Sequence, residues 1–283
     1  MPPLELVVDL LLRLVLPCVL VGAVLAAIAA RFARGMWGSV GLAVATAAGL
    51  AVGNYLRDLL PWTPDGAGWP WLLPATLFTL AIAAISKSFA GYHKAQLTLM
   101  AVVAVLATVC LVPEDLRSAA WMVGFGLVVL GNSFLLDRSM QQKQSGLILL
   151  ALAALLCGGA GAVLIFAHSA RFSDTAMMLG ATLAGVAVPA WWWQRDTSVL
   201  AMPLAVFLPG LLISGYDSTY SDVPAASFAL AAAAPLALAL AGLPPFKRVS
   251  AWKRWVLQVG LVAIPVIAAV ALAQWFDDLG TGY

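Results

Sequence analysis

Ten long apolar runs follow one another along the chain, and this repetition constrains the fold more than any other feature. Each run is close to the ~20 residues that an α-helix needs to cross the hydrocarbon core of a bilayer. A segment in lipid must satisfy its own backbone hydrogen bonds, which a helix does internally. We therefore predict an all-α polytopic membrane bundle of about ten transmembrane helices, with spans at 14–30, 36–56, 71–86, 95–112, 118–136, 145–168, 175–193, 198–215, 224–243 and 255–276.

The charged residues between the runs separate by sign onto alternate connections. One side carries most of the cations: Arg31, Arg34, Lys87, Lys94, Arg138, Lys143, Arg195, Lys247, Arg248, Lys253 and Arg254, with only Asp137 and Asp196 opposing them. The other side, which includes both termini, carries four cations (Arg13, Arg57, Arg117, Arg171) and the remaining acids: Glu5, Asp9, Asp58, Asp65, Glu114, Asp115, Asp174, Asp217, Asp222, Asp277 and Asp278. Lys and Arg concentrate in cytoplasmic loops. This pattern predicts a cytoplasmic basic side and two termini on the non-cytoplasmic side.

Composition excludes a water-soluble protein. The chain is 63% hydrophobic and 10% charged, whereas soluble domains carry about 25% charged residues. The longest connection, about 57–70, is too short for a soluble domain, so residues 1–283 are predicted to form a single transmembrane domain. The lipid bilayer is the expected partner, and no basic docking face for nucleic acid is present. High Ala, Leu and Gly content favours a bacterial plasma (inner) membrane.

Small residues recur every four positions in the second span. Gly41, Ala45, Gly49 and Gly53 form a stripe along one helix face, and such stripes permit close approach of a neighbouring helix. Packing within the chain is the expected role, and a homodimer seam is the alternative.

Glycine and proline interrupt several later spans. Gly158, Gly159 and Gly161 lie near the centre of the sixth span, where they predict either close helix packing or a hinge. Pro209 and Gly210 interrupt the eighth span, and proline also falls within the ninth and tenth spans, at Pro235 and Pro265. Each proline removes a backbone hydrogen bond and favours a kink.

Ionisable groups inside spans are the strongest indication of function in a membrane protein, and this chain has few. Asp9 and Arg13 are four residues apart and can pair on one helix face at the outer interface. They are the candidates for proton or ion coupling, with Asp9 as the acid and Arg13 as its counter-ion. Arg13 can also reach water from its position, which is the structural alternative.

Polar or backbone-disrupting positions near the membrane supply the candidates for substrate binding. They are Asn54, Asn132, Pro209, Gly210, Ser214, Asp217, Asp222 and Gln258. A buried amide needs a hydrogen-bond partner, so bonding between helices is the alternative role for Asn54, Asn132 and Gln258. Serine and threonine hydroxyls are weaker evidence, because they often bond their own helix.

No catalytic, cofactor or metal motif is found. The two histidines, His93 and His168, fall on opposite sides of the membrane, which disfavours a shared haem or metal. Cys18, Cys110 and Cys157 lie in apolar spans without a CxxC pattern. No nucleophile motif or phosphate-binding glycine loop occurs. We expect no catalytic residues, no cofactor and no bound metal.

Three functions remain, and the first is favoured. Ten spans with minimal loops, interrupted helices and few deep charges favour a small permease or exporter for a neutral or lipophilic solute. The alternative is a non-catalytic subunit or assembly factor that binds a membrane-protein partner. The third is a lipid-modifying or lipid-translocating protein, for which the outer acids would supply the polar groups.

Overall fold

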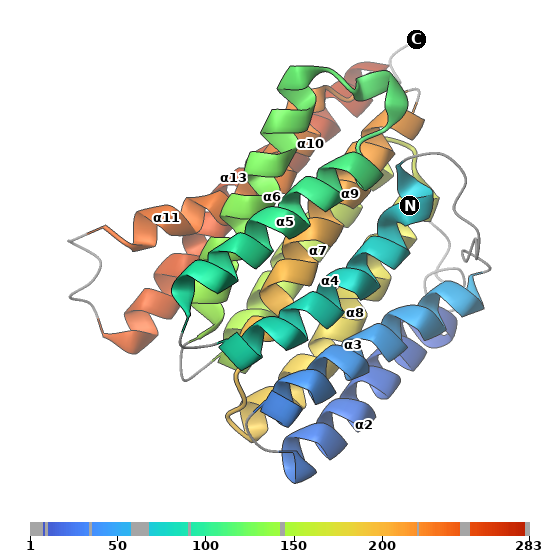
Figure 1. The fold of residues 1–283 in the computed structure, drawn as a ribbon. Helices are drawn as coiled ribbons and strands as arrows, with labels where there is room; N and C mark the ends of the chain where they lie inside the picture. Colours follow the sequence, from blue (N-terminus) through green and yellow to red (C-terminus); the bar gives the residue numbers. More distant parts are fainter. Residues whose placement is uncertain are drawn as a thin grey trace.

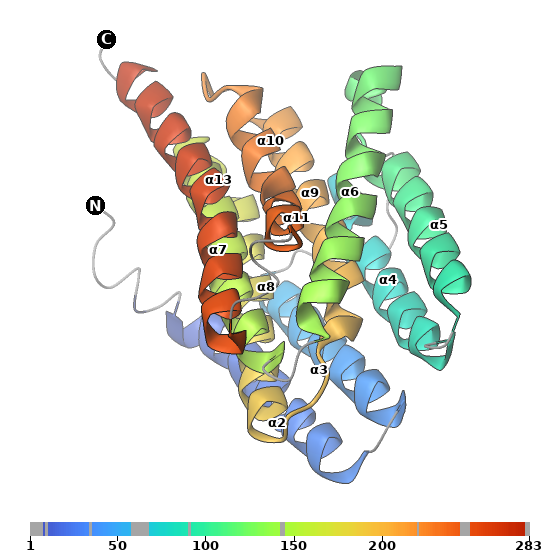
Figure 2. The ribbon, with the colours of Figure 1, turned by 90° about the vertical axis from the view of Figure 1, so that its left-hand side faces the viewer.

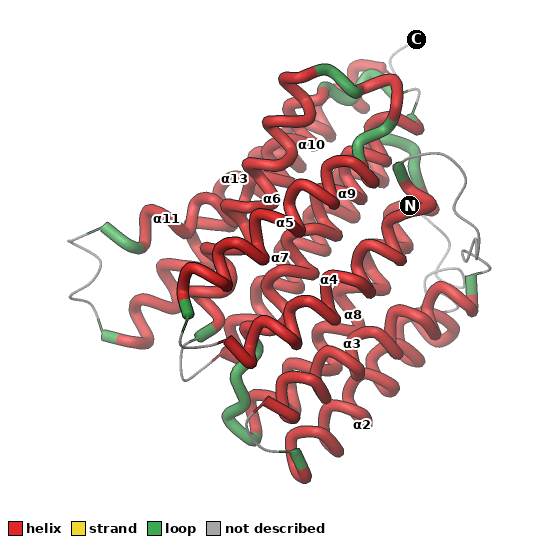
Figure 3. The backbone as a smooth tube through the Cα atoms, in the orientation of Figure 1, coloured by secondary structure: helices red, strands yellow, loops and turns green. Residues whose placement is uncertain are grey.

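The all-helical bundle predicted from the sequence is confirmed. The computed structural model describes residues 8, 11–33, 36–57, 68–89, 92–141, 145–219, 221–243 and 250–280. In these segments the chain is helical, with short turns between the helices and no strand (Figure 3). Nine of the described helices are long and apolar enough to cross a membrane. The protein is therefore a multi-pass membrane protein of helical class.

The helices follow the apolar runs closely and stand side by side, with successive long helices running in opposite directions (Figure 1). The first half comprises η1 (Leu11–Val15), α2 (Leu16–Phe32), α3 (Met36–Leu56), η2 (Trp69–Trp71), α4 (Leu72–Ser86), η3 (Lys87–Phe89), α5 (His93–Leu111), η4 (Glu114–Leu116) and α6 (Ala119–Met140). The second half comprises α7 (Ser145–Phe166), α8 (Ala170–Trp192), η5 (Ser198–Leu200), α9 (Ala201–Ser218), α10 (Ala225–Ala233), η6 (Ala234–Ala237), α11 (Leu238–Ala241) and α13 (Ala251–Gly280).

The ninth span is interrupted near Pro235, where the sequence predicts a kink, and it is not one continuous helix. The α-helical hydrogen bonding of α10 ends at Ala233, a 3₁₀ turn follows in η6, and α11 adds one further α-helical turn. Pro235 lies inside η6 and has no N–H to donate to an α-helix, which accounts for the break at this place. By contrast, Pro209 and Pro265 lie within α-helices that continue through them.

Polar contacts join the helix ends in two separate sets. At one end, the ammonium of Lys87 lies 2.8 Å from a carboxylate oxygen of Asp137, and the guanidinium of Arg195 donates to the carbonyl of Ala30. At the other end, Arg57 pairs with Asp174 at 2.6 Å. We call these the basic end and the acidic end, after the predicted loop charges. A cation on the last carbonyls of a helix, as at Ala30, is favourable for the helix dipole.

Helix α9 forms the centre of the bundle. Its entire membrane-spanning window is buried within the protein, and Figure 1 shows it between α4 and α5 on one side and α7 on the other. Helices α4, α5, α6, α7, α8 and α10 all contact it. A helix that is apolar on every side is expected in a position that is buried all round.

Glycines permit close packing of α2, α3 and α8. A Cβ on Gly49 would lie 2.5 Å from a methyl carbon of Thr182 in α8, and a Cβ on Gly53 would lie 2.7 Å from the sulfur of Met178. Gly41 contacts Ala29 of α2, and Ala45 is fully buried. The small-residue stripe therefore faces neighbouring helices of the same chain. The predicted homodimer seam would have to use another face.

We expect Gly49→Ala to lower the free energy of unfolding by about 1–3 kcal/mol, the usual cost of adding a methyl group to a closely packed interface. The measurement is the unfolding midpoint in a denaturing-detergent titration. Gly260→Ala is the matched control, because a Cβ at Gly260 meets nothing within 4 Å. The control variant should unfold at or above the wild-type midpoint, since alanine favours helix over glycine. Equal effects of the two changes would contradict the close α3–α8 contact.

Candidate functional site

The main candidate site is an apolar cavity between α6, α9 and α10, with a volume of about 410 Å³. We call it the apolar pocket. Its lining contains no Lys, Arg, His, Asp or Glu: it consists of Ala120, Trp121, Gly124, Phe125, Val128, Pro209, Leu212, Ile213, Tyr216, Ala225, Phe228, Ala229, Ala232 and Ala233. Volumes of about 300–1,000 Å³ with mainly apolar walls are typical of small-molecule sites.

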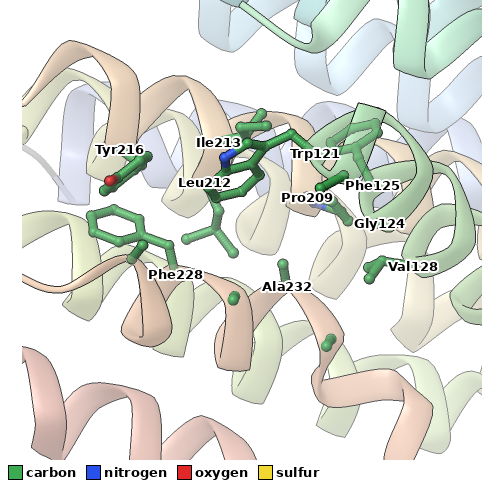
Figure 4. A pocket seen from close by; sticks show the side chains of 14 residues that line it. Trp121, Gly124, Phe125, Val128, Pro209, Leu212, Ile213, Tyr216, Phe228 and Ala232 are labelled. Carbon is green, nitrogen blue, oxygen red and sulfur yellow. The ribbon is translucent and has the colours of Figure 1, made fainter. Parts of the chain in front are cut away.

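Aromatic rings lie together along one wall of the apolar pocket (Figure 4). The rings of Trp121 and Tyr216 stack with centroids 6.0 Å apart, and the Phe228 ring meets Tyr216 edge to face at 5.5 Å. These three side chains come from three different helices, α6, α9 and α10. Aromatic pairs in these geometries are favourable beyond the area that they bury. The aromatic contacts therefore hold together the three helices that line the pocket.

The local sequence explains the space between the helices. Helix α10 presents only alanine to the cavity below Phe228, and α6 presents Gly124 one turn from Ala120. A Cβ on Gly124 would meet nothing within 4 Å. Small side chains on two facing helices leave a volume that the large side chains of α9 do not fill. Pro209 lines the pocket from α9, where it has no backbone N–H to donate.

A buried amide lies at the inner limit of the apolar pocket. Asn132 is one helical turn beyond Val128 on α6, and its Nδ2 donates to the carbonyl of Ala232 at 2.8 Å. In a 3₁₀ turn the carbonyl of Ala232 would accept from the backbone N–H of residue 235, but that residue is proline and has no N–H. The Asn132 side chain donates to this carbonyl instead, at the place where α10 is interrupted. The Oδ1 atom of Asn132 is buried with no hydrogen-bond partner among the described residues. It is an unused acceptor beside the cavity.

Only one of the predicted substrate-binding residues, Pro209, lines the apolar pocket. Gly210 faces Leu111 and Leu72 instead, and the Asn54 amide donates to Leu50 of its own helix. Ser214 is buried with no partner for its hydroxyl among the described residues.

The remaining predicted residues are spread over the two ends. Asp217 and Asp222 are exposed at the acidic end, where Asp217 is close enough to Asp115 for electrostatic repulsion. Gln258 lines a second pocket at the basic end.

The predicted coupling and hinge residues are not brought into the apolar pocket. Asp9 lies outside the described residues, so its predicted pair with Arg13 is not described; Arg13 itself is exposed in η1. On α7, Gly159 packs against Val266 of α13, and a Cβ added to Gly161 would lie 3.5 Å from the Ser173 hydroxyl. A Cβ added to Gly158 would meet nothing within 4 Å. The contacts of Gly159 and Gly161 are those of helix packing, and the hinge stays a prediction.

Sequence reasoning missed the aromatic residues of the pocket. Tryptophan near the end of a membrane span usually belongs to the interfacial aromatic belt, so Trp121 alone does not indicate a pocket. The available signal was the four-residue spacing of Trp121 and Phe125 on α6, which places both rings on one helix face. Among the described residues, no group of three or more His, Cys, Asp or Glu side chains is arranged to hold a metal.

The sequence matches no protein-family model and no curated protein. The functional argument therefore depends on the chain's own residues.

We expect Asn132→Ala to destabilise the fold by about 1–2 kcal/mol, because hydrogen bonds between membrane helices contribute at most about that much. Asn54→Ala is the matched control, since the Asn54 amide bonds a carbonyl of its own helix and joins no second helix. Unfolding midpoints of both variants in a denaturing-detergent titration provide the comparison. An effect of Asn54→Ala as large as that of Asn132→Ala would refute a special role for the α6–α10 bond.

Proposed function

We propose that the protein is a small permease or exporter that moves a neutral or lipophilic solute through the apolar pocket. The observation that carries this proposal is an apolar cavity of about 410 Å³ with no charged side chain in its lining. Burial of apolar surface contributes about 25 cal/mol per Å², so an uncharged solute can bind there without desolvating a charge. Four aromatic rings, those of Trp121, Phe125, Tyr216 and Phe228, offer flat apolar surfaces to the same solute.

The surroundings of the apolar pocket disfavour anions. Asp115 and Asp217 lie at the acidic end, the end at which Tyr216 lines the cavity. Two carboxylates that repel each other also repel an approaching anion, most strongly at low ionic strength. A neutral or weakly cationic lipophilic molecule is the solute class that these charges admit.

The interrupted helix beside the pocket supports movement of a solute past it. Ala232 and Ala233, which end α10, line the apolar pocket, while Leu238 and Ala239 of α11 line the second pocket at the basic end. The 3₁₀ turn η6 lies between these two pairs. Short 3₁₀ segments within helices often mark hinges. In the proposed mechanism, a change at η6 opens the apolar pocket toward the basic end.

We expect flux of at least one lipophilic neutral solute into proteoliposomes, above that of protein-free liposomes. Gly124→Leu should lower the flux about tenfold, since its side chain would occupy the cavity and remove on the order of 1.4 kcal/mol of solute binding. Gly260→Leu is the control, because Gly260 lies in α13 in open space and outside the pocket. No flux with any class of solute, or equal losses in both variants, would overturn the proposal.

We further propose that the basic end faces the cytoplasm of a bacterial plasma membrane, on the basis of the loop charges. Ser218 and Ser250 are exposed at the acidic and basic ends respectively. In intact cells, an impermeant maleimide should label Ser218→Cys and not Ser250→Cys, and both should react after lysis. The natural cysteines provide the background, measured with the unmodified chain. Labelling of Ser250→Cys alone would reverse the orientation.

A further inference from the structure

A second pocket lies at the basic end, between α6, α11 and α13, with a volume of about 470 Å³. We call it the basic pocket. Figure 2 shows α10 and α11 lying between α6 and α13 on this face of the bundle. Its lining is Leu135, Arg138, Ser139, Leu238, Ala239, Ala241, Gly242, Leu243, Arg254 and Gln258. It combines two guanidinium groups with apolar walls and contains no carboxylate.

The nearest carboxylate is engaged on another side of α6. Asp137 precedes Arg138 in sequence, but its two oxygens accept from Lys87 at 2.8 Å and from the Gln141 amide at 2.6 Å. Arg138 makes no ion pair with any described residue and is exposed. The positive charge of Arg138 is therefore not neutralised by the acid next to it in sequence.

Uncharged donors complete the polar part of the basic pocket. Ser139 is 3% exposed, and its hydroxyl has no hydrogen-bond partner among the described residues. Gln258 is 6% exposed and lies one helical turn after Arg254 on the same face of α13. Two guanidinium groups, a hydroxyl and an amide at one concave site are the donors that bind a phosphate group, because charge-assisted hydrogen bonds to phosphate are strong.

The remaining lining indicates a lipid as the source of the phosphate. Leu135, Leu238 and Leu243 give the basic pocket apolar walls that a free, hydrated phosphate would not use. Trp252, near the start of α13, is 62% exposed and stacks on Trp255 with centroids 5.0 Å apart. Exposed tryptophan is enriched at the level of lipid headgroups, which places the basic pocket at that depth. Basic pockets between membrane helices are a recurring form of site for anionic lipids.

We propose that the basic pocket binds the phosphate-bearing headgroup of an anionic lipid from the adjacent leaflet. Arg138 and Arg254 pair with the phosphate, Ser139 and Gln258 donate hydrogen bonds, and the acyl chains lie against the leucines. The bound lipid bridges α6 and α13 across α11. This proposal does not rest on transport through the apolar pocket and holds for either orientation in the membrane.

The test is native mass spectrometry of the full chain in mild detergent with equal amounts of phosphatidylglycerol and phosphatidylcholine. Wild-type protein should retain phosphatidylglycerol at least about tenfold better, since a hydrogen bond to a charged group contributes roughly that factor. Arg138→Gln with Arg254→Gln should abolish the preference. Arg31→Gln with Lys94→Gln is the matched control, because it removes the same charge from exposed residues at the same end. The control variant should keep the preference.

Ala239→Phe provides a variant that keeps both arginines and fills the basic pocket from an exposed position of α11. It should lower phosphatidylglycerol retention by about tenfold, as the double arginine variant should. If the double arginine variant does not fold, Ala239→Phe still tests whether the lipid binds in the basic pocket. Equal retention of both lipids by the wild type, or an equal loss in the control variant, would overturn the proposal. So would displacement of phosphatidylglycerol by millimolar inorganic phosphate, since the site would then bind the free ion.

Discussion

Helix α9 has no side that faces lipid, and the arrangement of the other helices follows from that. Every residue from Ala201 to Gly215 is buried, so side chains of neighbouring helices must cover all of its surface. In a bilayer, backbone groups freed by a proline must be satisfied by protein or water, and Pro209 lies in the part of α9 that neighbouring helices bury. The surrounding helices pack closely around α9 except at the apolar pocket, where α6 and α10 present glycine and alanine.

The break in α10 has consequences beyond its own backbone. Pro235 ends the regular hydrogen bonding, and alanines on both sides of it supply little volume. The apolar pocket and the basic pocket therefore lie on either side of η6. A continuous helix with larger side chains would have packed against α6 at both places. Asn132 bonds across the gap between these cavities. A buried amide in lipid has few alternative partners, so this contact favours one register of α10 against α6.

The sequence predicted the features that depend on the bilayer and missed those that depend on which helix faces which. Span positions and charge segregation follow from membrane thickness and from the cost of burying charge, and both can be read along one chain. Threonine hydroxyls such as Thr46 and Thr108 bond their own helix carbonyls, as expected. The neighbours of Gly210, Leu111 and Leu72, could not be predicted, because α9 is apolar all round and has no periodicity that identifies a facing helix. Trp121 and Tyr216 are amphipathic side chains that suit a membrane interface and a cavity wall equally well. Their residue types therefore do not distinguish these two positions in the sequence.

The two pockets differ in polarity because the charge asymmetry of the loops extends into the helix ends that line them. Arg138 and Arg254 lie in the last turn of α6 and the first turns of α13, the positions where cations belong at the basic end. At the opposite end, Asp115 and Asp217 are near the aromatic wall. An anion is therefore attracted to one pocket and repelled from the approach to the other. A lipid held at the basic pocket would join α6 and α13 beside η6, the 3₁₀ turn at which we propose that the apolar pocket opens, and would oppose that opening.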